Sequence, residues 1–229
     1  MTRKPARHAR ARSQGNRRRR LAPDERERLI AQAAVHFFAE QGFEGQTREL
    51  ARRLGIAQPL LYRYFPSKHA LIERVYREVF VDPWRDEWFV ALADRRRPLK
   101  ERLIYFYREY ARTAVGYERV RLFILAGLKG GLDLNARFFK MLREHVFVAV
   151  VREVREANGL PTLDRVPMSE TEAELVWMLH AAIFYIGIRH WIYGLPVPEN
   201  IDPVIEAMIV TFLEGIPKEM ATLTGAQPA

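Results

Sequence analysis

The sequence of 229 residues contains no cysteine. Without thiols the chain cannot form a disulfide framework, a thiolate nucleophile or a zinc site built on thiolates. The absence also fits a reducing compartment. The first 20 residues hold no apolar run of the length that a secretory signal requires. We therefore expect a cytoplasmic protein.

The short signatures of several enzyme classes are absent as well. The sequence has no HExxH, no GxSxG and no glycine-rich phosphate-binding loop, which mark zinc proteases, α/β-hydrolases and nucleotide-binding proteins. The aspartates and glutamates are scattered in a way that fits exposed helix faces. We expect no enzymatic activity, no metal site and no cofactor.

The formal net charge of +9 is concentrated in one short segment. Residues 1–20 contain nine basic and no acidic side chains, so the rest of the chain, with 28 basic and 28 acidic residues, is close to neutral. A segment of this composition is expected to be disordered when the chain is alone, and it can neutralise DNA phosphates in a complex. The cluster of Arg17, Arg18, Arg19 and Arg20 is the candidate DNA-binding arm.

From Leu21 onward the apolar residues recur at helical spacing nearly throughout, and no segment alternates as a strand does. The pattern predicts a first helix that Asp24 caps and Gly42 ends, two short helices over 47–54 and 58–64, and a fourth from Ser67 to about Val81. Further helices are predicted from Pro98 to about Thr113, and over about 117–128, 135–158, 169–193 and 202–215. The predicted fold class is all-α.

The stretch 47–64 has the pattern of a helix-turn-helix. Gly55 allows the backbone to take a positive φ between the two short helices. Ala51 and Leu54 face inward from the first helix, and Leu61 from the second. In such a motif the second helix enters a DNA major groove. Short helix pairs also serve only as scaffold, so the pattern alone leaves both interpretations open.

The residues in and around this motif resemble the N-terminal domain of the tetracycline-repressor (TetR) family of transcription regulators. The ordered matches, within roughly residues 24–80, are Gly42-Phe43, Thr47, Arg48-Glu49-Leu50-Ala51, Leu54-Gly55-Ile56, Leu61-Tyr62, Tyr64-Phe65, Ser67-Lys68 and Ala70-Leu71. The resemblance implies a three-helix DNA-binding domain over 21–66 and a larger helical domain for ligand binding and dimerisation over 67–229. It also implies a homodimer formed through the last two helices.

The sequence departs from the family pattern at two places. The loop before the second helix is one residue shorter than usual, which puts the N-cap of that helix in question. We favour Thr47, because Gln46 is a poor cap. Where the family often has serine, this chain has Ala57, so the next helix lacks that cap.

The resemblance also implies which side chains contact DNA. Phosphate contacts are assigned to Thr47, Tyr62, Tyr64 and Lys68, base contacts to Gln58, Pro59, Leu60 and Arg63, and either kind to Arg48. Among them Gln58 can pair with adenine through two hydrogen bonds. Partial packing in the core is the alternative for Tyr62, and Leu61 and Phe65 are predicted to be core.

Residues 175–193 are apolar almost all round. A membrane-spanning helix needs about 20 apolar residues, but this run contains His180, Arg189 and His190, and a capping box of Ser169 and Glu172 begins it. A helix that is apolar on every face is buried on every face. We expect it to pack on its own domain and on a second subunit, with the final helix as its companion, and we expect no membrane contact.

The larger domain is rich in aromatic residues, most of which are expected to form core. The candidates for an effector pocket are Tyr107, Tyr110, Phe123, Trp177, His180 and Phe184, with His180 as the polar group among them. The sequence thus predicts a repressor that binds a palindromic DNA operator as a dimer and is released by a small apolar or aromatic effector. The alternative is a non-specific or architectural DNA-binding protein, for which the basic arm would suffice.

Overall fold

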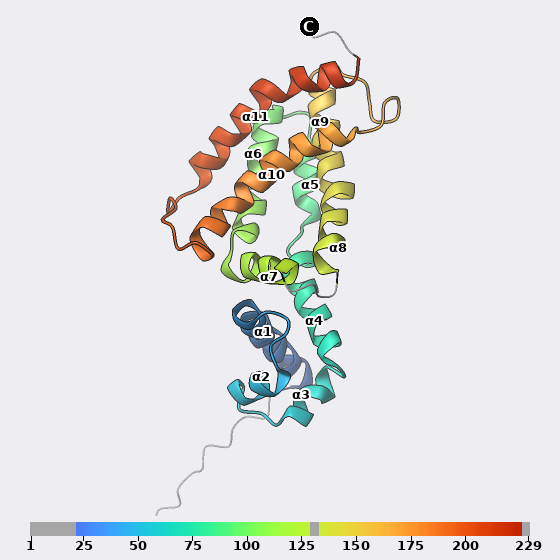
Figure 1. Cartoon of the computed structure of the whole chain (residues 1–229). Coiled ribbons are helices and arrows are strands. Elements are labelled where there is room, and N and C mark those ends of the chain that lie inside the picture. The colour runs from blue at the N-terminus through green and yellow to red at the C-terminus, as the bar shows by residue number, and fades with distance from the viewer. Residues whose placement is uncertain (1–21, 129–132, 226–229) are drawn as a thin grey trace, which may run out of the picture.

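The computed structural model of the protein describes residues 22–128 and 133–225. Within these ranges every regular element is a helix (Figure 1), so the predicted all-α class is confirmed. The molecule is elongated, with α1 to α3 gathered at one end and the larger helical domain at the other. The predicted basic arm, residues 1–20 with its four arginines at positions 17–20, lies outside the described residues.

The N-terminal domain consists of α1 (Pro23–Gln41), α2 (Thr47–Arg53) and α3 (Gln58–Tyr64), with α4 (Lys68–Tyr76) packed against them. Its core takes one or more side chains from each of the four helices, among them Phe38, Leu50, Leu61 and Leu71, all buried. These are the positions at which the sequence shows helical spacing, so local pattern and tertiary packing agree.

Two predicted helix caps are wrong. The first helix begins at Pro23 with Ala22 as its N-cap, and Asp24 lies in the first turn instead, because the fixed φ of proline suits the first helical position. The N-cap of α2 is Gln46 and not Thr47, and its side chain makes no capping hydrogen bond. The Thr47 hydroxyl is bonded to α3 instead.

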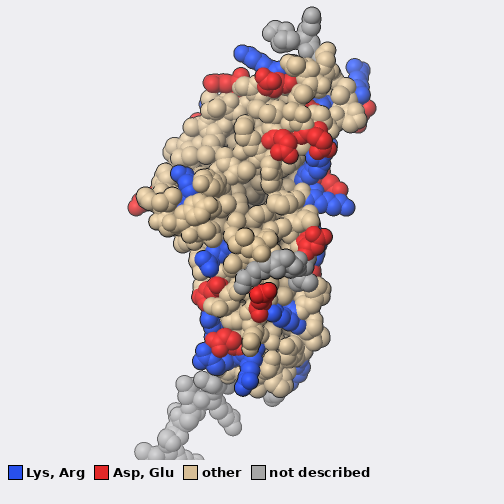
Figure 2. Space-filling view, viewed as in Figure 1, with Lys and Arg blue, Asp and Glu red and all other residues tan. Residues whose placement is uncertain are grey.

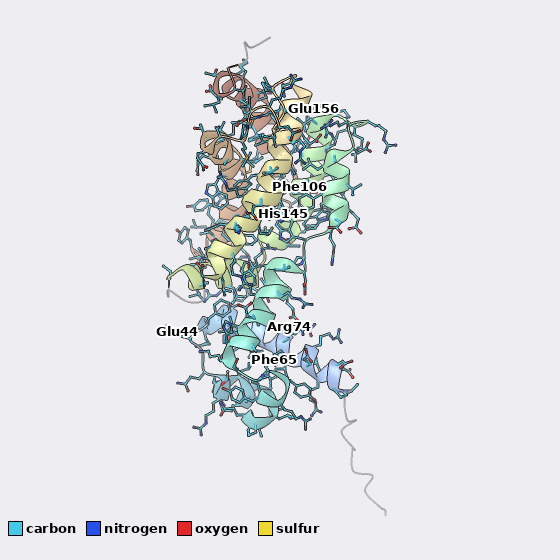
Figure 3. The ribbon with its side chains drawn as sticks, turned by 90° about the vertical axis from the view of Figure 1, so that its right-hand side faces the viewer. Glu44, Phe65, Arg74, Phe106, His145 and Glu156 are labelled. Atoms are coloured by element: carbon cyan, nitrogen blue, oxygen red, sulfur yellow. The ribbon has the colours of Figure 1, made fainter. Side chains whose placement is uncertain are left out.

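The fourth helix connects the two domains. As predicted, Ser67 caps it, accepting a hydrogen bond from the backbone N–H of Ala70, and the helix continues to Val81. Its last turn is π-helical and is labelled η1 (Arg77–Val81). Figure 3 shows α4, marked by Arg74, running from the N-terminal helices into the larger domain.

The next helix, α5 (Asp86–Ala93), was not predicted. Eight residues make only two turns, which repeat the helical spacing too few times to be recognised. It packs against α6 (Leu99–Ala114), which the sequence did predict. The two helices bury Trp88, Leu92 and Phe106 between them and their neighbours.

The remaining helices complete the larger domain. They are α7 (Tyr117–Leu128), α8 (Leu134–Met141), the π-helical η2 (Leu142–Phe147), α9 (Val148–Ala157), α10 (Glu170–Trp191) and α11 (Asp202–Leu223). The elements α8, η2 and α9 follow one another without a break, as the prediction of one long helix requires. The capping box of Ser169 and Glu172 begins α10 as predicted.

Helix α11 is longer than predicted. It passes Gly215 and Pro217 and ends at Leu223. A proline inside a helix removes one backbone hydrogen bond, but the side chains of Ile216 and Met220 on this last stretch are buried. Tertiary packing therefore sustains the helix where local propensity would end it.

Helix α10 is, within the described residues, long and apolar enough to cross a membrane by length and composition. Of its most apolar 18-residue window, 44% is buried inside the chain. A core helix of a soluble protein passes the same test, so length and composition do not distinguish the two.

Candidate DNA-binding site

The turn between α2 and α3 fixes the two helices against each other. Gly55 has a φ of +63°, a left-handed conformation that glycine adopts without strain. The backbone N–H of Ile56 donates to the carbonyl of Ala51 at 3.0 Å and closes the turn. Leu50, Ala51 and Leu61 are buried at the contact of the helices, so the orientation of α3 is set by packing.

A hydrogen-bonded group of three side chains joins the start of α2 to α3. The hydroxyls of Thr47 and Tyr62 lie 2.8 Å apart, and Nε2 of Gln58 donates to Oγ1 of Thr47 at 3.1 Å. Thr47 itself is buried. The threonine hydroxyl therefore holds in place two side chains of α3 that the sequence assigns to DNA, at positions one helical turn apart.

The other predicted contact residues gather around this group. Arg48, Pro59 and Arg63 are exposed, and the Arg63 guanidinium lies 5.5 Å from the ring centre of Tyr64. The half-buried side chains are those of Gln58, Leu60, Tyr62, Tyr64 and Lys68. Leu61 and Phe65 are buried, as predicted for core residues.

Arg48 and Gln58 share a small surface hollow between α2 and α3. The hollow has a volume of about 450 Å³, and Gln46, Arg52 and Ile56 also line it. Side chains from two helices therefore meet at one place, which is what reading a base edge beside a phosphate requires.

The basic residues of α2, α3 and the start of α4 fall into two groups. Arg52 and Arg53 pair with Glu49, and Arg53 also pairs with Glu40 at 2.6 Å. The hydrogen bonds from these arginines, Arg52 first, hold the pKa of Glu49 down at about 2. Figure 2 shows basic and acidic side chains side by side at this end.

The second group consists of Arg48, Arg63 and Lys68. Among the described residues none of these three forms an ion pair with a carboxylate. Their charges remain available to an external anion. The three come from α2, α3 and the start of α4, and Arg48 and Arg63 directly follow Thr47 and Tyr62 in the sequence.

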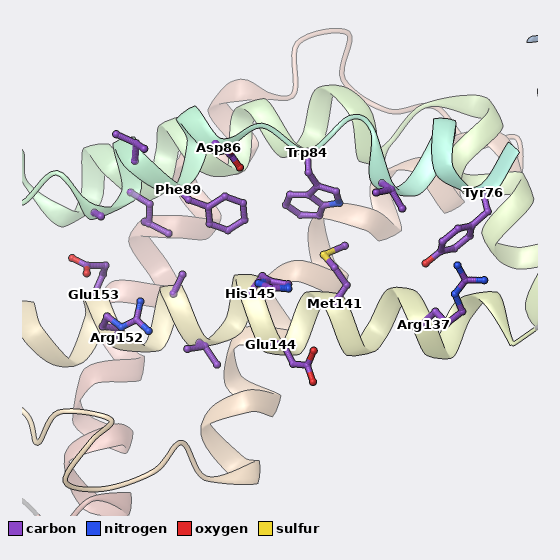
Figure 4. Close-up of a pocket in the computed structure, with 16 residues that line it drawn as sticks. Tyr76, Trp84, Asp86, Phe89, Arg137, Met141, Glu144, His145, Arg152 and Glu153 are labelled. Atoms are coloured by element: carbon purple, nitrogen blue, oxygen red, sulfur yellow. The ribbon is translucent and has the colours of Figure 1, made fainter. Parts of the chain in front are cut away.

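The larger domain contains an open cavity of about 760 Å³. It lies between η1 and α5 on one side and α8, η2 and α9 on the other (Figure 4). The apolar part of its wall includes Trp84, Phe89, Met141 and Val148. Arg137, Glu144, His145 and Arg152 contribute polar groups.

None of the six predicted pocket residues lines this cavity. Tyr107, Tyr110 and His180 are buried, and Phe123 and Phe184 pack against each other with ring centres 5.1 Å apart. Trp177 stacks on His180 at 5.8 Å. Trp84 connects the cavity wall to the predicted pocket residues, because it lines the cavity and its ring stacks on that of Tyr110, with ring centres 5.6 Å apart. The sequence missed the cavity because one of its walls is the unpredicted α5.

Burial controls the ionisation of His180, the predicted polar group of the effector pocket. Burial and, to a smaller extent, the positive charge of Arg119 lower the pKa of His180 to about 3. Neither ring nitrogen has a hydrogen-bond partner among the described residues. His180 is therefore a neutral and unsatisfied polar group near pH 7.

Several side-chain contacts join the domains besides the chain itself, among them those of Arg121 and Arg137. Nε of Arg121 on α7 donates to the carbonyl of Ala39 near the end of α1 at 2.7 Å. Arg137 of the cavity wall pairs with Glu73 on α4 at 2.7 Å, and its guanidinium lies 4.5 Å from the ring centre of Tyr76. The cavity and the N-terminal helices are thus mechanically connected through α4 and α7.

Residues 30–75 match the family model described as "Bacterial regulatory proteins, tetR family". Over 126 residues, 47% of this chain, the sequence is 32% identical to the class A tetracycline repressor protein of transposon 1721 from Escherichia coli, of which the matched region covers 58%. The resemblance to the TetR family that the sequence indicates is confirmed, and the family model matches the segment that contains α2 and α3.

Solved structures extend the likeness of the fold to both domains. A TetR-like transcriptional regulator from a Rhodococcus species has a TM-score of 0.63 at 17% identity, over 86% of this chain and all of that one. A putative transcriptional regulator from Pseudomonas aeruginosa has a TM-score of 0.63 at 15% identity, over 90% of this chain and 96% of that one. The arrangement of a small helix-turn-helix domain on a larger helical domain is therefore a known one.

Proposed function

We propose that the protein is a transcription regulator that binds a palindromic DNA operator as a homodimer and releases it when a small effector binds. The observation that carries this proposal is the surface of α2 and α3. Their buried contact fixes the orientation of α3, while Arg48, Arg63 and Lys68 present charges that have no carboxylate partner among the described residues. The family match over residues 30–75 supports the same function.

In the proposed complex α3 lies in the major groove. Gln58 pairs with adenine and Arg63 with guanine, since amides and guanidinium groups match those base edges. Pro59 and Leu60 pack on thymine methyl groups, and the phosphate contacts fall to Tyr62, Tyr64, Lys68 and Thr47. Arg48 reaches a phosphate or a base. Because the hydroxyl of Thr47 already bonds Gln58 and Tyr62, we assign to it mainly the positioning of these two side chains.

The proposed dimer uses the outer faces of α10 and α11. Met178 and Tyr185, seven residues apart on α10, are 57% and 48% exposed. Figure 2 shows that the middle of the face formed by these helices is almost free of charged side chains, which gather at its upper end. A large uncharged apolar face on one chain is typical of a protein interface. On α11 the inward residues Ile205 and Ile209 are already buried within the chain, so the opposite face of that helix is the one available to a partner.

The cavity is the proposed place of effector entry. Its volume lies within the range of about 300–1,000 Å³ that is usual for small-molecule sites. Tyr76 and Val81, at the end of the connecting helix, line it. A ligand that favours one position of these residues shifts α4 and with it α3, and ligand and DNA affinities are then reciprocally linked.

Selection of genomic DNA fragments by the full-length protein tests the proposal. We expect a single two-fold symmetric motif to be recovered, with half-sites about 10 base pairs apart from centre to centre or a multiple of that. Recovery of fragments without a common motif would favour the non-specific, architectural alternative.

A further inference from the structure

Three arginines are buried in the larger domain, and two of them have carboxylate partners. Arg155, which is 1% exposed, forms two hydrogen bonds with Glu172, at 2.8 and 2.6 Å. Arg102, which is 4% exposed, pairs with Glu153 at 2.7 Å. Each also donates to backbone carbonyls. A carboxylate partner and further hydrogen bonds offset the cost of removing a charged group from water, as a buried charge normally requires.

The third arginine lacks this compensation. Arg119 on α7 is 4% exposed. Within the described part of the chain its guanidinium makes one hydrogen bond, from Nη1 to the hydroxyl of Thr113 at 3.3 Å. Its Nη2 has no partner among the described residues. The guanidinium lies 5.4 and 5.2 Å from the ring centres of Phe80 and Phe138. Ring faces attract a cation, but they do not neutralise its charge.

Other buried polar atoms without partners lie in the same interior. Among the described residues they include the hydroxyl of Tyr107 and both ring nitrogens of His180. The ring of Tyr110 lies 4.3 Å from that of His180, and Tyr107 and His180 are in edge contact at 6.3 Å. The charge of Arg119 contributes to the lowered pKa of His180, so these two groups lie within electrostatic range of each other. Tyr107 adjoins them through its ring contacts with Tyr110 and His180.

Most of the unsatisfied atoms are hydrogen-bond donors. Nη2 of Arg119 and the Tyr107 hydroxyl are donors, and neutral His180 supplies one more donor and one acceptor. A carboxylate accepts several such hydrogen bonds and supplies the missing negative charge, and guanidinium groups bind it with two parallel bonds. The surrounding wall of phenylalanine, tyrosine and tryptophan rings suits an apolar or aromatic body.

We propose that Arg119 is the anchor for an anionic effector, a carboxylate carried on an apolar or aromatic body, with Tyr107 and His180 as its further hydrogen-bond partners. This inference rests on the proposed function, because it names the class of effector. Since Arg119 is 4% exposed, a ligand reaches it only when the rings around it move apart.

The cavity described above is the route to this anchor. Its wall includes Tyr76 and Trp84, which Figure 4 shows along one side. Tyr76 stacks on Phe80 at 5.4 Å, and Phe80 in turn lies against Arg119. Phe80 belongs to η1, the end of the connecting helix, so the movement that admits the ligand also displaces the element that leads to α3.

Thermal unfolding of the full chain tests the anchor without DNA. The probes are octanoate and 4-phenylbutyrate, each compared with its uncharged amide at the same concentration. We expect the carboxylates to raise the unfolding midpoint of the wild-type protein and the amides to raise it much less. Arg119→Met should have a midpoint equal to or higher than that of the wild type without ligand, and it should lose the difference between acid and amide.

Arg155→Met is the matched control, because it removes a buried arginine that has its carboxylate partner. It should lower the unfolding midpoint by several degrees. Tyr107→Phe removes only a hydroxyl without a partner, so it should leave the midpoint without ligand unchanged and weaken the response to the carboxylates several-fold. This variant tests the site even when Arg119→Met does not fold.

The anchor is contradicted by either of two results. One is a midpoint of Arg119→Met as low as that of Arg155→Met, which would make Arg119 a structural residue. The other is a wild-type protein that the carboxylates stabilise no more than the amides do. A separate titration of the DNA complex distinguishes the two proposals: carboxylates that bind through Arg119 but release no operator would leave the anchor standing and contradict the effector mechanism.

Discussion

At the scale of single residues, the DNA-binding surface depends on one buried hydroxyl. Thr47 bonds both Gln58 and Tyr62 and so limits the freedom of two side chains before DNA arrives. Ordering a side chain on binding costs free energy, and a side chain that is already ordered saves part of that cost. The sequence predicted all three as contact residues, but their bonds to one another depend on the tertiary distance between α2 and α3.

Gln58 is expected to read a base and Tyr62 to contact a phosphate. Gln58→Ala should weaken binding to the specific operator by about 1–3 kcal/mol and leave binding to random DNA almost unchanged. Tyr62→Phe should lower both affinities by a similar factor, because phosphate contacts carry no direct sequence information. Titrations with both DNAs at one salt concentration measure this. If Gln58→Ala lowered the affinities for the two DNAs equally, Gln58 would not be a residue that reads a base.

The lowered pKa of His180 predicts that the stability of the protein depends on pH. That pKa is about 3 in the folded protein, against about 6.5 for an unperturbed histidine. Between these values the unfolded chain binds one more proton, so the free energy of unfolding falls as the pH drops below 6.5. The slope for this group is about 1.4 kcal/mol per pH unit.

The variant His180→Phe lacks this proton and keeps an aromatic ring at the site. Between pH 6.5 and 5, denaturant unfolding should therefore show the wild type losing about 2 kcal/mol more than the variant does. Parallel losses in the two proteins would mean that His180 is accessible to protons in the folded state.

At the scale of helices, the length of an element decided whether its pattern could be recognised. Helices α1, α6 and α10 have several turns, and most of the buried positions in them are apolar. Helix α5 is too short for the same test, and with it one wall of the cavity was missed. The end of α11 was missed for the opposite reason, since Gly215 and Pro217 are local stop signals that the burial of Ile216 and Met220 overrides.

The contact of α10 with α7 depends on a glycine. A Cβ added at Gly187 would lie 2.7 Å from Cγ2 of Val120 and 3.0 Å from Cα of Val115. Gly187→Ala should therefore destabilise the protein by about 1–3 kcal/mol through overpacking. Gly215→Ala is the matched control in α11, because nothing lies within 4 Å of its added Cβ, and it should stabilise by up to about 1 kcal/mol. Denaturant midpoints measure both, and a Gly187→Ala protein as stable as the control would show that the helices can separate freely.

At the scale of the whole molecule, dimerisation should depend on the uncharged face of α10 and α11. Met178→Glu places a charge at the proposed interface, where burial without a partner is strongly unfavourable. We expect this variant to sediment as a monomer at micromolar concentration while the wild type sediments as a dimer. Val90→Glu is the control, since Val90 is 70% exposed on α5, and it should stay dimeric. A wild-type monomer at this concentration would contradict the interface.

The central claim is that the charged and polar surface of α2 and α3 reads a DNA sequence. The most direct measurement is the ratio of the affinity for the selected palindrome to that for random DNA of equal length, at one salt concentration. We expect a ratio of roughly 1,000 or more, as is typical of specific regulators, and two protein chains on each site. A ratio near one would contradict sequence-specific regulation and would make the protein a general DNA-binding protein.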